Sequence, residues 1–317
     1  MRSSFFATFF ATLLLATAPS VLAQAFPGKL VRIVIPFSLG GSNDLTARIL
    51  LPQLTERWKQ QVIIEPHVGA ASTVGSAYVA KSAPDGHTIL FTSTQYVYAP
   101  STFANLPFDP LNDLVPVTLV TVSPQMIAAH PQLPANTPKQ LIALARSHPG
   151  QLTIGNAGNS LPTYSLITLS KTKMTPVSYK GAGPLTIDIM GGHVPLGMAA
   201  ISSFMPTVKS GRAKVIGVCS LERTPLYPDA PAMAEAVPGF EAVAWFGMFV
   251  PRGTPPAVIK RIRDDIADVM KIPDVRKRLH EIGGDPSGMQ PEEFGKMVRA
   301  EIDKWNKVAK AAGIKPQ

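Results

Sequence analysis

The residues of this chain that could do chemistry gather in two short polar loops. Each loop follows an apolar run and precedes a stretch whose apolar residues have helical spacing. Their glycines allow close approach of the backbone to a ligand, and their Ser, Asn and Thr side chains add neutral donors. The predicted ligand-binding residues are Ser38, Leu39, Gly40, Gly41, Ser42, Asn43 and Asp44 in the first loop, and Asn156, Ala157, Gly158, Asn159, Ser160 and Thr163 in the second.

A loop between a strand and a helix can bind an anion. The first amides of a helix have no partner within it, and the helix dipole adds partial positive charge there. In an open α/β sheet, ligands bind beyond the carboxyl ends of the strands. Two such loops facing each other predict a carboxylate clamp, and the alternative is that both are ordinary caps and turns. Because an acid would repel an anion, Asp44 is expected to cap or brace its loop, with binding of a polar ligand group as the alternative.

No motif for catalysis or metal binding accompanies these loops. The sequence has no Gly-x-Ser-x-Gly elbow, His-Glu-x-x-His, Walker loop or Gly-x-Gly-x-x-Gly. Its six histidines lack the spacing of metal ligands, and its one cysteine, Cys219, lies in an apolar run that predicts a buried side chain. We therefore expect no catalytic residue, no metal, no cofactor and no enzymatic activity.

Strands alternating with helices must position the loops. Predicted strands cover residues 30–35, 61–65, 88–92, 115–122, 152–155, 177–179, 195–200, 215–219 and 244–250. Predicted helices begin after 42 or 43 and at 163, and cover 76–82, 138–146, 183–190, 204–210, 255–270, 273–282 and 291–312. Ser42 or Asn43 is expected to cap the first helix with its side chain, and Thr137 to cap the helix at 138. This alternation predicts an α/β protein with mostly parallel sheets flanked by helices.

The length of 317 residues suits two domains. The last, purely helical segment cannot bury its apolar faces alone, so the chain is expected to return and cover the first α/β unit. Two segments then cross between the lobes, as in a hinged two-lobe protein with a cleft. The predicted domains are a first lobe of 24–122 and 248–317 and a second lobe of 123–247.

The N-terminus predicts export. A basic start at Arg2, an apolar run over 5–15 and small residues before Ala23 or Ala25 form a cleavable signal peptide, taken as 1–23. The apolar run is too short to span a bilayer, and no later segment is long enough. The net charge of +9 is spread evenly, with Lys and Arg alternating with acids on helices, which argues against nucleic acid as a partner. A monomer is expected.

Several motifs together carry a family resemblance. With Val31 to Phe37, Gly40 to Asp44, Ala83 to Thr88, Tyr179 to Pro184 and Pro251 to Pro255, the chain resembles the substrate-binding proteins of tripartite tricarboxylate transporters, the Bug family. The resemblance implies a periplasmic binding protein of type II, the Venus-flytrap fold, which captures a small carboxylate and delivers it to membrane permease subunits. It also implies that both loops hold the carboxylate through amides and ordered water, with a pocket wall of Thr92, Ser93, Thr94, Tyr179, Ala200 and Ser202. The alternatives are an exported enzyme of unknown class and a ligand-sensing partner of a membrane sensor.

The chain departs from the family pattern at positions that bear on the ligand. Leu39 and Leu161 enter the two loops, and Ala199 and Ala200 stand where a polar residue is frequent. A buried second charge would then lack a partner. This predicts a ligand with one carboxylate and an apolar body, such as an aromatic or medium-chain acid. The alternative is that both leucines point into the lobes and leave the pocket polar.

Overall fold

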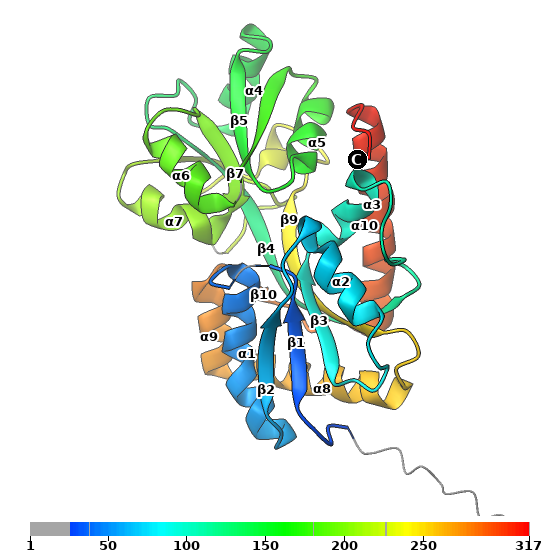
Figure 1. The fold of residues 1–317 in the computed structure, drawn as a ribbon. Coiled ribbons are helices and arrows are strands. Elements are labelled where there is room, and N and C mark those ends of the chain that lie inside the picture. The colour runs from blue at the N-terminus through cyan, green and yellow to red at the C-terminus, as the bar shows by residue number, and fades with distance from the viewer. Residues whose placement is uncertain (1–25, 38, 180, 226, 317) are drawn as a thin grey trace, which may run out of the picture.

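The computed structural model describes residues 26–37, 39–179, 181–225 and 227–316 (Figure 1). The predicted signal peptide and Ser38 lie outside these ranges. Within them, a ten-stranded sheet runs in the order β2-β1-β3-β9-β4-β7-β5-β6, and β8 and β10 both pair with β4. The sheet thus passes through the whole described molecule, and helices cover its faces.

The bounds of the elements follow the alternation predicted from the sequence. The strands are β1 Val31–Ile35, β2 Val62–Pro66, β3 Thr88–Ser93, β4 Leu114–Ala129, β5 Leu152–Ala157, β6 Met174–Tyr179, β7 Leu196–Ala200, β8 Lys214–Val218, β9 Val243–Pro251 and β10 Asp285–Pro286. The α-helices are α1 Ser42–Trp58, α2 Thr73–Ala80, α3 Gln95–Thr102, α4 Pro138–Ser147, α5 Leu161–Ser170, α6 Ala182–Met190, α7 Ile201–Lys209, α8 Pro256–Lys271, α9 Pro273–Glu281 and α10 Pro291–Ala311. Two short 3₁₀ helices span Ala70–Ser72 and Met233–Glu235.

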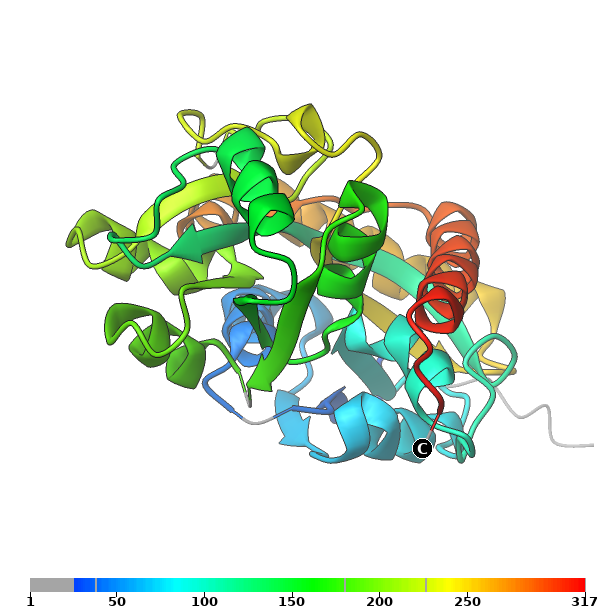
Figure 2. The ribbon, with the colours of Figure 1, turned by 90° about the horizontal axis from the view of Figure 1, so that it is seen from above.

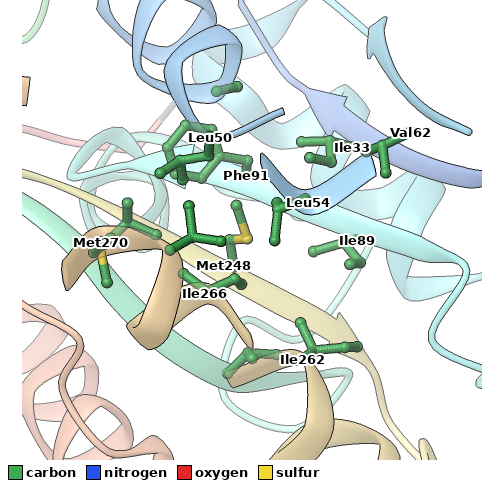
Figure 3. Close-up of a cluster of buried hydrophobic side chains, with 14 of the residues drawn as sticks. Ile33, Leu50, Leu54, Val62, Ile89, Phe91, Met248, Ile262, Ile266 and Met270 are labelled. Carbon is green, nitrogen blue, oxygen red and sulfur yellow. The ribbon is translucent and has the colours of Figure 1, made fainter. Parts of the chain in front are cut away.

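Lobe 1 is built on β1, β2 and β3, which are parallel to one another. Strand β9 extends this part antiparallel to β3. One face of the sheet packs against α1, α8 and α9 in a core that includes Ile33, Leu54 and Ile266 (Figure 3). The other face packs against α2, α3 and α10. The return of the C-terminal helices to the first α/β unit, which the sequence predicted, is therefore confirmed.

Lobe 2 repeats this layered arrangement with its own strands. Strand β5 pairs in parallel with β6 and β7, and β4 pairs antiparallel with β7 and β8. One core gathers side chains of α4 and α5, and another gathers side chains of α6 and α7 on the opposite face. Because each lobe buries both faces of its sheet, its strands read as apolar runs rather than as alternating patterns.

Two long strands connect the lobes. From Leu114 to Pro124, β4 pairs with β9, and from Gln125 to Ala129 it pairs with β7 and β8. The expected two-lobe α/β fold with two crossing segments is confirmed, with β4 and β9 as the crossings (Figure 1). Both strands run across the predicted domain boundaries at 122 and 247, so those exact boundaries stay a prediction.

A third contact joins the lobes at one side. Helix α10 packs against α3 of lobe 1 and α5 of lobe 2, and these three helices lie together in the view from above (Figure 2). The side chain of Leu161, at the start of α5, is fully buried in the core of lobe 1 that contains Trp245 and Phe294. The lobes are therefore packed together on the α10 side.

Local predictions met different outcomes. Thr137 caps α4, accepting a hydrogen bond from the Gln140 amide at 3.3 Å, and Cys219 is fully buried, as predicted. Burial raises the pKa of the Cys219 thiol well above its ordinary value. The cap predicted for α1 is wrong, because Gly41 occupies the N-cap position and no side chain bonds there. Helix α3 was not predicted.

Across the described residues, none of the helices combines the length and the apolar character that crossing a membrane requires.

Candidate functional site

The first predicted loop joins β1 to α1 at the edge of lobe 1 that faces lobe 2 (Figure 1). Gly40 has a φ of +82°, which glycine adopts without strain, whereas Gly41 is extended with a φ of −81°. The Asn43 side chain donates to the Phe91 carbonyl on β3 at 3.4 Å. The loop is thereby fixed to the neighbouring strand. Ser38 lies outside the described residues.

Asp44 braces this loop, as predicted. Its Oδ2 accepts a hydrogen bond from the Gly40 amide at 2.8 Å, and its Oδ1 accepts one from Arg48 Nε at 2.9 Å. Burial opposes ionisation of this carboxyl, but the bonds from Arg48 and Gly40 outweigh burial and lower the pKa of Asp44. The carboxylate is therefore ionised at neutral pH, and Arg48 offsets its negative charge.

The first turn of α1 keeps its amides available. The Leu45 amide is the first to bond within the helix, to the Gly41 carbonyl at 3.0 Å. The amides of Ser42, Asn43 and Asp44 precede it and have no intrahelical acceptor. Since α1 is 17 residues long, its dipole reinforces these donors. This end of α1 can hold a carboxylate without any cationic side chain.

The second predicted loop joins β5 to α5 in lobe 2 and uses most of its groups internally. The Gly158 amide donates to the carbonyls of Asn156 at 3.0 Å and Tyr179 at 3.1 Å. The Asn159 side-chain oxygen accepts from the Leu161 amide at 2.8 Å. In addition, the buried Thr163 hydroxyl donates to the Asn156 side-chain oxygen. These bonds make the loop rigid but leave few donors for a ligand.

The donors that remain in the second loop are backbone amides. Pro162 has no amide hydrogen, and the Tyr164 amide donates to the Ser160 carbonyl at 3.0 Å. The amides of Asn159, Ser160 and Thr163 have no such partner among the described residues. The Ser160 hydroxyl lies 2.7 Å from the Ser178 hydroxyl. Lobe 2 can thus add neutral donors to an anion site, but fewer than lobe 1.

The residues implied as pocket wall differ in their surroundings. Thr92, Ser93 and Thr94 are buried at the end of β3, and the Thr92 hydroxyl has no hydrogen-bond partner among the described residues. Tyr179 donates its hydroxyl to Asp188 Oδ2 at 2.7 Å. Burial and this bond raise the pKa of Tyr179 to about 12. Tyr179 therefore keeps its proton at neutral pH.

Ala200 and Ser202 stand where β7 gives way to α7. Both side chains are half-buried. A β-carbon at Gly283, which follows α9 in lobe 1, would lie 3.2 Å from the Ser202 β-carbon. The structure thus places this turn against lobe 1, at the junction where the two lobes meet.

The prediction of a ligand with an apolar body rests on four residues, and two of these are buried in cores of the lobes. Leu161 is fully buried in a core, and Ala199 is 3% exposed in another. Leu39 is 51% exposed, and Ala200 is half-buried. Helix α5 begins at Leu161, two residues earlier than predicted, and packs against α10. The basis for an apolar ligand is thereby reduced to Leu39 and Ala200.

Sequence reasoning missed one residue of this region, Gln95. Its Nε2 lies 3.1 Å from the point that a β-carbon on Gly158 would occupy, so it reaches the second loop from lobe 1. Ser93 and Thr94, one residue before the apolar residues 96 and 97, form an N-terminal helix signal that could have located α3.

Cavities in lobe 1 lie away from these loops. One of about 400 Å³ lies between α8 and the start of α10. A second cavity, of about 590 Å³, is lined by residues between 100 and 110. A third, of about 540 Å³, lies at the end of α8. None of the three is lined by a predicted site residue. Among the described residues, no three His, Cys, Asp or Glu side chains are grouped as a metal would require.

Comparison with known proteins identifies the family. Residues 46–314 match the model of the tripartite tricarboxylate transporter family receptor, TctC. The UPF0065 protein in the tcbD-tcbE intergenic region of Pseudomonas sp. strain P51 is 33% identical over 301 residues, which cover 92% of this chain and 90% of that protein.

Solved structures agree with this match. The R. palustris protein Rpa4515 with adipate has a TM-score of 0.83 at 30% identity, covering 92% of this chain and all of that one. MatC from Rhodopseudomonas palustris with bound malate has a TM-score of 0.78 at 31% identity, covering 90% of this chain and all of that one. The family consists of solute-binding receptors, so the alternative of an enzyme falls away. This protein belongs to the tripartite tricarboxylate transporter family of receptors.

Proposed function

We propose that this protein captures a small carboxylate between its two lobes in the periplasm and delivers it to the membrane permease subunits of a tripartite tricarboxylate-type transporter. The observation that carries the proposal is the start of α1, where several amides without intrahelical partners meet a helix dipole. Relatives solved with adipate and with malate support a carboxylate as the ligand class.

The proposed binding residues divide between the lobes. In lobe 1, Ser38 to Asp44 form the binding loop, in which the amides of Ser42, Asn43 and Asp44 are available, and Thr92, Ser93 and Thr94 form the wall beside it. In lobe 2, Asn156 to Ser160 and Thr163 contribute the second loop, with Tyr179, Ala200 and Ser202 beside it. We propose lobes of 24–122 with 248–317 and of 123–247, which close over the ligand by bending β4 and β9.

A thermal-shift screen over aliphatic and aromatic mono-, di- and tricarboxylates tests the capture of a carboxylate. A ligand that binds only the folded protein raises its midpoint of unfolding as its concentration rises. We expect a saturable increase for at least one carboxylate, and prolonged incubation should return that carboxylate unchanged. No stabilisation by any carboxylate, or turnover of one, would contradict the proposal.

Export to the periplasm has its own test. Mass spectrometry of the protein from the periplasmic fraction should give a mature N-terminus after Ala23 or Ala25. A chain that retains Met1, or that stays in the cytoplasm, would contradict this part of the proposal.

Delivery to the permease predicts that deleting the gene for this receptor abolishes uptake of the ligand found in the screen.

A further inference from the structure

Gln95 lies where lobe 1 meets the second loop. It is the first residue of α3, which begins directly after β3, the strand between β1 and β9. Its amide lies 3.5 Å from the Ser93 hydroxyl, which accepts its hydrogen bond. Its sequence neighbours Thr94 and Tyr96 are buried, whereas Gln95 is half-buried. At this turn, therefore, Gln95 is the side chain that reaches the surface of lobe 1.

The side chain of Gln95 crosses to lobe 2. Its Nε2 lies 3.1 Å from the β-carbon position of Gly158, a separation tighter than most carbon contacts in proteins. Gly158 has a φ of +110° and is the first residue of the β5–α5 loop. Helices α3 and α5 both pack on α10 beside this point, which holds the two lobes close here (Figure 2). The carboxamide thus lies against the backbone of the lobe 2 loop.

This carboxamide makes no hydrogen bond to any other described residue. The Gly158 amide beside it already donates to Asn156 and Tyr179, so it needs no acceptor from Gln95. A carboxamide offers two N–H donors and one acceptor, and half-buried polar groups of this kind ordinarily bond to protein, water or ligand. Gln95 therefore has donor capacity available beside the second loop.

The charge around the second loop makes such a donor useful. None of the residues predicted in the two loops is Lys or Arg, and the Arg48 guanidinium beside the first loop is paired with Asp44. The second loop retains only a few free amides. A carboxylate there needs neutral donors, and bonds from such donors to a charged group are stronger than bonds between neutral groups.

We propose that Gln95 is a ligand-binding residue that donates from Nε2 to a carboxylate oxygen held by the β5–α5 loop. One side chain of lobe 1 and the loop of lobe 2 then bind the same group, so binding and closure of the lobes occur together. This inference rests on the proposed function, since it assigns a residue to that same site.

Isothermal titration calorimetry of the whole mature chain tests the role of Gln95. Benzoate, adipate, malate and citrate serve as probes, and variants are compared on the one that the wild type binds most tightly. Gln95→Leu removes the donors at similar size and should weaken binding about 10- to 100-fold. Gln95→Glu should weaken it more, because a carboxylate then faces a carboxylate. Gln95→Asn withdraws the donors by one methylene and should also bind more weakly than the wild type.

A matched control is Gln53, a half-buried glutamine in the middle of α1 that also lacks a hydrogen bond to other described residues. Gln53→Leu should bind as the wild type does. Unliganded Gln95→Leu should unfold near the wild-type temperature, which separates a binding role from a structural one. Wild-type affinity in folded Gln95→Leu and Gln95→Asn would overturn the inference and leave the proposed function standing. A wild type that binds none of the four probes would overturn the proposed function and the inference with it.

Discussion

The β1–α1 loop and the β5–α5 loop occupy matching places in the two lobes, yet they use their hydrogen-bonding groups differently. The first loop is braced by one side chain, Asp44, and leaves the first amides of a 17-residue helix free. The second loop bonds largely to itself through Gly158, Asn159 and Thr163, and its helix has 10 residues.

This difference assigns different tasks to the two lobes. A helix end with free amides attracts an anion, so lobe 1 should supply most of the binding energy. A loop whose groups are already bonded keeps its shape, so lobe 2 should supply a fixed surface against which the ligand is enclosed. The four predictions below test this division, from the largest expected effect to the smallest.

Truncating the anchor of the second loop should have the largest effect. Leu161→Ala empties a fully buried position and should lower the free energy of unfolding by roughly 2 to 5 kcal/mol, measured by urea denaturation. The matched change in the first loop, Leu39→Ala, removes a side chain that is 51% exposed and should alter stability by less than about 0.5 kcal/mol. Equal losses for the two leucines would contradict the comparison.

Adding bulk to the first loop should weaken binding without unfolding the protein. Gly41→Val places a branched side chain where the free amides begin, and the φ of −81° is one that valine adopts readily. We expect roughly 10-fold weaker carboxylate binding or more by calorimetry, about 1.4 kcal/mol, with little change in the unfolding midpoint. Normal binding by the folded variant would show that the first loop is not the clamp.

Removing the brace of the first loop should have a pH-dependent effect. Asp44→Asn weakens the bonds to Gly40 and Arg48, and should cost about 1 to 2 kcal/mol at pH 7. Because the pKa of Asp44 is lower in the folded state than its ordinary value of 3.8, the brace stabilises the protein fully above that value. Its contribution is lost as the pH falls through the folded pKa, so the difference between the variant and the wild type should shrink as the pH falls below 3.8. A difference that stays constant as the pH falls below 3.8 would contradict this role.

The smallest effect is expected at the pocket wall of lobe 2. Tyr179→Phe removes one hydrogen bond, to Asp188, from a half-buried ring and should cost about 0.5 to 1.5 kcal/mol of stability. Since the Tyr179 hydroxyl is held by Asp188, carboxylate affinity should change less than threefold. A large loss of affinity with unchanged stability would instead make Tyr179 a direct ligand donor.

Much of the fold could be predicted from local pattern. Apolar runs located the strands, and proline near the first turn marked α8, α9 and α10, because its missing N–H costs nothing there. Helix α3 escaped because it is only eight residues long and contains Pro100, so its spacing of apolar residues is weak.

The sequence by itself determined the class of the protein, the places of its two loops and the bracing role of Asp44. These follow from short-range features, such as a glycine loop between strand and helix, that act within a few residues. The tertiary structure decided the features that depend on contacts between residues far apart in the sequence. Leu161 lies in a core because α10 returns from the C-terminus to cover α5, and Gln95 meets Gly158 because α3 and α5 both pack against α10. Such contacts join residues more than 60 positions apart, and no local pattern of side chains records which of them will meet.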